Sequence, residues 1–243
     1  MTRTSMVAAV AALVAAALTM VVAAAAGPEK ELALYRVTLI NLTAGQPFSP
    51  PVAATHDKSM RMFRVGKLAS DELAAIAQDG NEGPMFALFD ASSKTTDAVD
   101  VATPLTPHGE IVGSFTDTVS FEIEGRTGDR LSLATMLICT NDGFLGLDSV
   151  KLPKRGAEAY LMNGYDAGRE ENTEDSLDLV DPCSALGPAA LPGDPDGNRD
   201  AEVATDPAER IAHHPNITGG GELSPGDHGW DDPVAVAIVA RID

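Results

Sequence analysis

The chain of 243 residues has only two cysteines, and their spacing excludes a CxxC, zinc or haem pattern. It also lacks a G-x-S-x-G sequence, a P-loop and a G-x-G-x-x-G sequence, which would indicate a hydrolase, a nucleotide hydrolase or a dinucleotide enzyme. Scattered Ser, His and Asp residues do not form a triad without the matching geometry. No residue is therefore predicted to be catalytic, and the chain is not expected to be an enzyme.

Basic side chains are scarce, because 17 Lys and Arg stand against 36 Asp and Glu and leave a formal net charge of −19. Such a charge makes nucleic acid and anionic membranes poor direct partners. Divalent cations are the natural counter-ions of so acidic a chain. The same charge would also serve solubility alone, so it does not by itself indicate a metal.

Long apolar runs are missing except at the amino terminus, so no later segment is expected to cross a membrane. Arg3 is followed by an Ala-rich apolar run over 6–26 that ends in small residues before Gly27. This pattern predicts a secretory signal peptide over 1–26, with cleavage near Ala26. Because the run approaches the ~20 residues that span a bilayer, an uncleaved anchor is the alternative. Cleavage would give a secreted protein, or a periplasmic one in a host with an outer membrane.

The remaining 27–243 have a length that one all-β domain commonly reaches. Apolar residues alternate with Ser and Glu over 119–124, which predicts a half-buried strand. The run 131–138 is mostly apolar on both faces, which predicts a strand in the middle of a sandwich. Apolar runs at 34–40 and 234–240 predict a first and a last strand.

One short helix is expected over 71–78, with Ser70 as its N-cap and Gly80 as its stop. The segment 181–232 is dense in Pro, Gly, Asp and Asn, which predicts a loop-rich part of the same domain and not a second one. The fold class predicted by these patterns is all-β, an antiparallel β-sandwich with one short helix and long loops.

The two cysteines are Cys139 and Cys183, and in an exported protein such a pair commonly forms a disulfide. The bridge would close a loop of about 44 residues, worth on the order of 3–4 kcal/mol in the chain-entropy model. Two separate buried thiols are the alternative.

Two short acidic segments lie between the cysteines, at 140–149 and 165–175, and each is predicted to be a loop that follows a buried strand. Together they offer Asp142, Asp166 and Glu170, three carboxylates of the hard oxygen type that Ca²⁺ prefers. For an isolated acidic loop in so acidic a chain, solvation without a metal is the simpler interpretation.

Several motifs in order identify a family resemblance. The motifs are YRVTLINLTAGQPFSPPVAATHD at 35–57, GSFTD at 113–117, LATMLICTNDGFLGLDSVKLP at 133–153 and YDAGREENTED at 165–175. Over about 32–243 the chain resembles the spondin domain, the amino-terminal module of F-spondin and mindin, in its compact bacterial or archaeal form. The resemblance implies an antiparallel β-sandwich of about eight strands with a bound calcium ion, a role in extracellular adhesion and recognition, and no catalysis.

The resemblance also implies a ligand set, in which Asp142, Asp166 and Glu170 match the family's three carboxylates. This chain has Gly143 where an aromatic residue is usual, and Glu170 where Asp is usual. The extra methylene of Glu170 moves its carboxylate, so the assignment of Glu170 as a ligand is weaker than that of the two Asp residues. Gly168 would let the chain turn tightly between Asp166 and Glu170, and backbone carbonyls and water would complete the six to eight oxygens.

Four other features have simpler interpretations. Asp148 is expected to support the first acidic segment and not to bind metal. The segment 194–200 resembles a calcium loop but lacks the Gly at position six and the Glu at position twelve of an EF-hand. The adjacent histidines 213–214, together with His228, would bind zinc only by accident of folding. Trp230 is either a ligand platform or an anchor for the final strand.

Two sequences, 41–43 and 216–218, have the form of glycosylation sequons, which matter only in a host that glycosylates exported proteins. The function predicted overall is that of a secreted calcium-binding spondin-domain protein that recognises an extracellular glycan or a matrix or cell-surface protein. The alternative is an exported calcium-dependent enzyme acting on polysaccharide, with Glu122, Glu124 or Asp117 recruited for acid–base chemistry.

Overall fold

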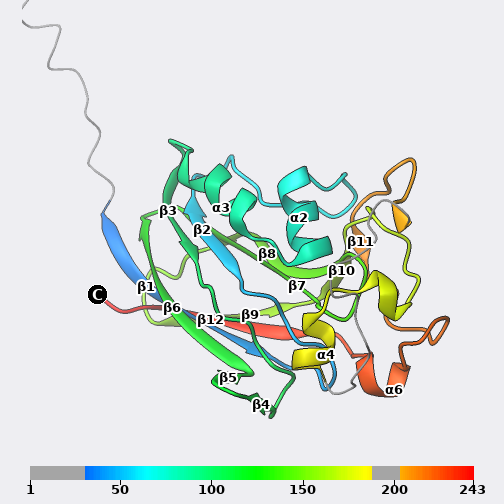
Figure 1. The fold of residues 1–243 in the computed structure, drawn as a ribbon. Helices are drawn as coiled ribbons and strands as arrows, with labels where there is room; N and C mark the ends of the chain where they lie inside the picture. The colour runs from blue at the N-terminus through cyan, green and yellow to red at the C-terminus, as the bar shows by residue number, and fades with distance from the viewer. Residues whose placement is uncertain (1–30, 188–202) are drawn as a thin grey trace, which may run out of the picture. The chain divides into compact units, whose positions relative to one another are not determined.

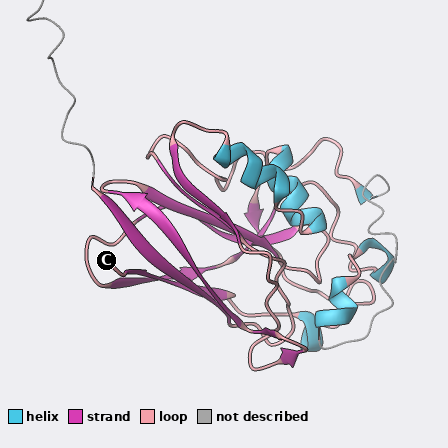
Figure 2. Ribbon diagram, turned by 60° about the vertical axis from the view of Figure 1, so that its left-hand side comes forward, coloured by secondary structure: helices cyan, strands magenta, loops and turns pink. Residues whose placement is uncertain are grey.

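A computed structural model describes residues 31–187 and 203–243, and the predicted signal peptide and the loop 194–200 lie outside these ranges. Leu32–Asp243 form one compact unit, which contains two antiparallel β-sheets (Figures 1 and 2). No helix among the described residues is long and apolar enough to cross a membrane.

The first sheet has four strands in the order β6-β1-β12-β9. Alternate residues of β1 and β6 are buried, as the sequence predicted for 119–124, and β12 lies inside the sheet between β1 and β9. The bounds are β1 Leu32–Asn41, β6 Thr118–Arg126, β9 Ala157–Met162 and β12 Ala235–Arg241.

The second sheet has six strands in the order β11-β10-β8-β7-β2-β3, and β7 lies in its middle as predicted. The bounds are β2 Val52–His56, β3 Thr95–Asp100, β7 Arg130–Met136, β8 Gly143–Lys151, β10 Gly164–Asp166 and β11 Ala212–His213. A separate two-stranded ribbon pairs β4 Ile111–Val112 with β5 Phe115–Thr116.

Side chains from both sheets form the main core, and the second sheet is buried on its other face as well. Helices α2 Asp71–Asp79 and α3 Gly83–Asp90 lie over β2, β7 and β8 (Figure 1). Leu73 and Ile76 of α2 pack in one cluster with residues such as Val52 and Ala134. This covering explains why β2 and β7 are buried without alternation.

Helix α2 begins and ends where the sequence predicts, within one residue. Ser70 Oγ accepts a hydrogen bond from the Leu73 amide at 3.3 Å, and Gly80 takes the left-handed conformation at φ 63°. Helix α3 was not predicted, and its first turn carries Pro84, which is tolerated there because the first amides of a helix have no partner within it. The fold class is confirmed as an all-β antiparallel sandwich.

The first acidic segment is not the loop that the sequence predicted, because only its first residues form a turn and Gly143 already starts β8. The second segment likewise begins on β10, which includes Asp166. Between 181 and 232 the described residues are mostly irregular, with three short elements and no further sheet of their own. These elements are α4 Pro182–Leu186, β11 and α6 Pro225–His228, and a single 3-10 turn, η1 Ser176–Asp178, precedes them.

Candidate functional site

The pairing of β8 with β10 brings the two acidic segments together. Gly143 lies opposite Asp166 in this antiparallel pair, so Asp142 faces the first residues after β10. The Ala167 amide donates to the Asp142 carbonyl at 3.1 Å. The turn before β8 is fixed by Thr140, whose Oγ1 donates to the Leu137 carbonyl and accepts from the Gly143 amide.

The Asp142 side chain is fully buried at the centre of this arrangement. Its Oδ2 accepts hydrogen bonds from the amides of Arg169 at 2.6 Å and Glu170 at 3.0 Å. Its Oδ1 is also shielded from solvent, and it has no hydrogen-bond partner in the part of the chain that the structure describes. Asp142 therefore has one oxygen that the protein satisfies and one that it does not.

Burial, and after it the negative charge of Asp166, raises the pKa of Asp142 to about 7. The amide donors of Arg169 and Glu170 act in the opposite direction but do not outweigh burial. The field at Asp142 thus favours a positive partner, either a proton or a metal cation.

Asp166 and Glu170 differ in how their carboxylates are held. Asp166 accepts from the Gly168 amide and from Asn172 Nδ2, both at 2.7 Å. Glu170 Oε1 accepts from Gln78 Nε2 of α2 at 2.7 Å, so its side chain is drawn toward that helix. The structure thus couples Asp166 electrostatically to Asp142, whereas Glu170 contributes its amide to Asp142 and its carboxylate to Gln78.

Gly168 adopts φ +70° between these residues, which L side chains rarely take. A Cβ at this position would also lie 2.6 Å from the Glu209 carbonyl carbon. The tight turn that the sequence predicted at Gly168 is thus required both by the backbone and by a neighbouring segment.

No group of three or more His, Cys, Asp or Glu side chains is arranged to hold a metal ion within 31–187 and 203–243. The calcium site with Asp142, Asp166 and Glu170 as ligands therefore stays a prediction. The unsatisfied Oδ1 of Asp142 fits a cation, and the hydrogen bond from Gln78 occupies one of the two carboxylate oxygens of Glu170.

Asp148 makes its contacts away from Asp142, Asp166 and Glu170. Its carboxylate accepts from Arg61 Nη1 at 2.8 Å and from the Met62 amide at 3.1 Å, so it holds the segment that follows β2 against β8.

The histidines do not gather into a zinc site among the described residues. His214 Nδ1 accepts from the Asn216 amide at 3.0 Å, and its ring lies 5.1 Å from that of Trp230. Burial lowers the pKa of His214 to about 4, against the opposing effect of three carboxylates, so the ring is neutral at pH 7. His213 instead packs on the ring of Tyr165.

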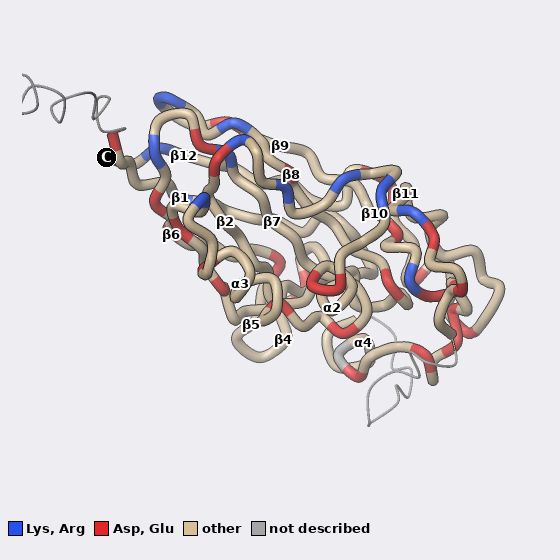
Figure 3. The backbone as a smooth tube through the Cα atoms, turned by 90° about the horizontal axis from the view of Figure 1, so that it is seen from above, with Lys and Arg blue, Asp and Glu red and all other residues tan. Residues whose placement is uncertain are grey.

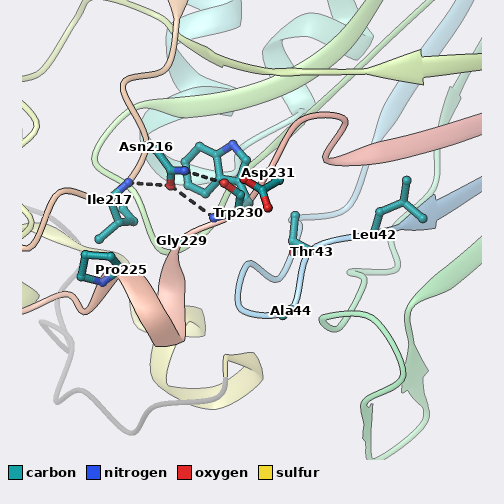
Figure 4. A pocket seen from close by; sticks show the side chains of 9 residues that line it. All are labelled: Leu42, Thr43, Ala44, Asn216, Ile217, Pro225, Gly229, Trp230 and Asp231. Atoms are coloured by element: carbon teal, nitrogen blue, oxygen red, sulfur yellow. Dashed lines mark hydrogen bonds between the residues drawn. The ribbon is translucent and has the colours of Figure 1, made fainter.

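A pocket of about 450 Å³ lies beside Trp230, between the loop after β1 and the loops around α6 (Figure 4). Trp230 itself is only 9% exposed and belongs to the main core, so it anchors the entry to β12. The Asn216 side chain holds the backbone beside this pocket, because its Oδ1 accepts hydrogen bonds from the amides of Ile217 and Trp230. The side chain of Asn41, the other sequon residue, is fully buried and donates to two backbone carbonyls.

Cys139 and Cys183 form a disulfide with a Cα–Cα distance of 5.0 Å, and both residues are buried. The bridge connects the turn that precedes Asp142 to helix α4. The two acidic segments therefore lie within the covalently closed loop.

One acidic residue with a structural role was missed by sequence reasoning. Glu174 has a positive φ of 56°, and its carboxylate accepts hydrogen bonds from the backbone amides of 218–220. The sequence places Glu174 among several similar acids, and nothing local distinguishes it from them.

Comparison with known proteins gives one family. The family model described as Spondin_N matches residues 41–173, which is more than half of the chain and includes Asp142, Asp166 and Glu170. A search of curated proteins found no match. The matched range also spans most strands of the second sheet, together with the pairing of β8 and β10 that joins the two acidic segments. The chain belongs to the Spondin_N family.

Proposed function

We propose that this protein is a secreted recognition module whose structure is completed by one calcium ion bound between the turn before β8 and the segment after β10. The observation that carries the proposal is Asp142, a fully buried carboxylate with one oxygen that no described group satisfies. A buried charge without a partner is costly, and a divalent cation removes that cost.

Asp142 and Asp166 are the ligands that the arrangement favours most, because they are adjacent and like-charged. Two neighbouring carboxylates repel each other unless a cation lies between them. Gln78 occupies Oε1 of Glu170, so Glu170 would join them through its other oxygen, Oε2, if it keeps this hydrogen bond. Carbonyl oxygens and water would supply the remaining positions that calcium requires.

The ion would have a structural role in this proposal. Tyr165, the one side chain of the His, Lys or Tyr type in the two acidic segments, is packed among the rings of Phe63, Phe144 and His213. Calcium would therefore tie two segments together and leave recognition to the surface around them.

The alternative of an exported enzyme finds no specific support. Glu122 is paired with Arg36, and Asp117 accepts from the Gly109 amide and contacts His108. Neither these residues nor Glu124 are among those that line the pocket beside Trp230. Spondin_N is also not a known enzyme family, which favours recognition of a glycan or a matrix or cell-surface protein.

The test is thermal unfolding in calcium and in chelator, for the wild type, Asp142→Asn and Asp90→Asn. A calcium concentration of 100 Kd stabilises the folded state by about 2.7 kcal/mol, which raises Tm by roughly 5–10 °C for a domain of this size. Asp142→Asn should lose most of this increase. Asp90→Asn removes an exposed charge on α3 and should keep it.

Two results would refute the calcium site. One is an equal Tm of the wild type in calcium and in chelator. The other is an equal loss of the calcium-dependent increase in Tm in Asp142→Asn and Asp90→Asn. Screening of glycans and matrix proteins with and without chelator then tests whether recognition depends on the ion.

A further inference from the structure

Basic side chains gather at one end of the sandwich although the whole chain has a net charge of −19. In Figure 3, basic segments of the tube lie near the end of β12 and in the turns beside it, with acidic segments between them. We call this region the basic end. It comprises the exposed Lys58, Lys94, Arg126, Lys151, Lys154 and Arg155 and the half-buried Arg130.

Strand order arranges four of these cations in a row. Lys151 ends β8 and lies opposite Arg130, which starts β7, and Arg130 in turn lies opposite His56 at the end of β2. Lys58 follows β2 by two residues, and Lys94 precedes the first residue of β3. Because neighbouring strands are about 4.8 Å apart, the ends of these four strands span roughly 14 Å.

Two further turns extend the row. Lys154 and Arg155 lie in the turn between β8 and β9, and Arg241 of β12 donates to the Lys154 carbonyl at 3.4 Å. Arg126 ends β6, and its guanidinium donates to Thr96 Oγ1 at 3.2 Å, close to the start of β3. The cations thus come from both sheets and meet at the same end.

Three carboxylates at this end are hydrogen-bonded to groups other than the side chains of the seven cations. Asp129 accepts from Thr96 Oγ1 and from the Arg126 amide, Asp243 pairs with Arg241, and Glu158 accepts from the Tyr160 hydroxyl. None of the seven cations of the basic end forms an ion pair within the described residues. In contrast, Arg36, Arg61 and Arg169 elsewhere on the surface are each paired with a carboxylate.

The pair Arg130 and Lys151 is unfavourable without an anion, because like charges directly opposite each other destabilise a sheet. Repulsion along the row is relieved when a chain of negative charges lies across it. The remaining acidic surface is screened beyond a Debye length of about 8 Å at physiological salt, so it does not prevent local binding.

We propose that the basic end binds a linear acidic polysaccharide, whose charged groups lie across the ends of β8, β7, β2 and β3. This names the partner class of the recognition module proposed above and rests on that proposal for its extracellular context. Binding of single-stranded nucleic acid would use exposed aromatic rings as stacking platforms. An aromatic residue that contacts the row is Tyr160, which is half-buried and hydrogen-bonded to the Lys151 carbonyl and to Glu158.

The experiment measures retention on immobilised dextran sulfate as a function of salt. The test variant is Lys151→Gln/Lys154→Gln/Arg155→Gln. The matched control is Arg64→Gln/Lys67→Gln/Arg210→Gln, which removes the same charge from exposed positions joined by the contact of Arg210 with the Gly66 carbonyl. Both variants should stay folded, because the substituted side chains are exposed, and loss of the repulsion between Lys151 and Arg130 should not lower the Tm of the test variant.

We expect the wild type and the control to elute at similar salt and the test variant to elute at clearly lower salt. In the test variant, the magnitude of the negative slope of log affinity against log salt should decrease by about one for each lost contact. Neutral dextran should retain none of the three proteins.

The proposal is overturned if the wild type is not retained, or if the control loses as much affinity as the test variant. It is also overturned if single-stranded DNA or anionic vesicles bind the same variants with the same pattern and at least equal affinity. Dextran sulfate binding should persist in chelator and in Asp142→Asn, because the basic end and the calcium site lie on different loops. Failure of one proposal is therefore distinguishable from failure of the other.

Discussion

The Glu174 carboxylate organises the loop that leads to α6. Its Oε1 accepts from the Thr218 amide at 2.5 Å and from Thr218 Oγ1 at 2.9 Å. Its Oε2 accepts from the amides of Gly219 at 2.7 Å and Gly220 at 2.8 Å. The Glu174 carbonyl also accepts from the amides of Glu222 and Leu223, so one residue holds six groups of this loop.

Substitution Glu174→Gln should therefore destabilise the protein although it preserves shape. The Gln oxygen would keep the two hydrogen bonds from Thr218, but its amide nitrogen would place a donor against the amides of Gly219 and Gly220. Two charge-assisted hydrogen bonds, each worth about 1.5–3 kcal/mol, would be lost. Because Gly219 and Gly220 are exposed and water replaces part of the loss, we expect a decrease of about 2–4 kcal/mol in the free energy of unfolding.

The difference in the free energy of unfolding between the wild type and Glu174→Gln should depend on pH in a defined direction. Burial alone would raise the pKa of Glu174, but the hydrogen bonds from Thr218, Gly220 and Gly219 outweigh it and lower the pKa below the ordinary value of 4.5. A carboxyl group with a lowered folded pKa stabilises the fold above its unfolded pKa, and this contribution is lost as pH falls through the folded value. The gap between wild type and Glu174→Gln should therefore be full above pH 5 and shrink below pH 4.5.

Urea unfolding at pH 7 and at several values below 4.5 measures this gap, with Glu171→Gln as the control. Glu171 is exposed in the same segment, so its substitution removes the same charge without the loop contacts. A gap under about 0.5 kcal/mol at pH 7, typical of a plain surface substitution, would refute the reasoning. So would a gap that does not change between pH 7 and pH 3.

Local patterns were sufficient to predict those parts of the fold that depend on local forces. The alternation over 119–124 gave β6 with the correct face inward, because the period of side chains along a strand is two. The helix at 71–79 followed from Ser70 and Gly80, which act through the hydrogen bonds of its own ends. The position of β7 in the middle of its sheet followed from apolar residues on both of its faces.

Features that depend on strand order and register could not be predicted. The start of β8 at Gly143 requires pairing with β7 and β10, which no property of the segment itself reveals. The row of cations at the basic end has the same origin, because Lys58, Lys94, Arg130 and Lys151 are scattered in sequence and meet only through the order β8-β7-β2-β3.

At the candidate site the sequence indicated candidate residues and could not indicate their contacts. The segments that carry Asp142 and Asp166 lie side by side, because β8 and β10 pair at Gly143 and Asp166. The contact of Glu170 with Gln78, 92 residues earlier in the chain, depends on where α2 packs on the sheet. Coordination by calcium stays a prediction, and Glu170 differs from the two Asp residues because its carboxylate contacts α2 through Gln78.

Two further predictions concern the frame around Asp142. Gly143→Ala should lower the free energy of unfolding by about 1–3 kcal/mol through overpacking, because a Cβ there would lie 2.3 Å from Thr140 Oγ1; an unchanged midpoint of urea unfolding would contradict this. Cys139→Ala/Cys183→Ala should lower it by about 4 kcal/mol, since the bridge closes a loop of 44 residues and restricts the unfolded chain. Alkylation of the unreduced wild type, followed by mass measurement, checks the pairing first, and two labelled thiols would exclude the bridge. If the bridge is present but its removal leaves unfolding unchanged, then the turn before Asp142 is held by its hydrogen bonds through Thr140 and does not need the covalent link.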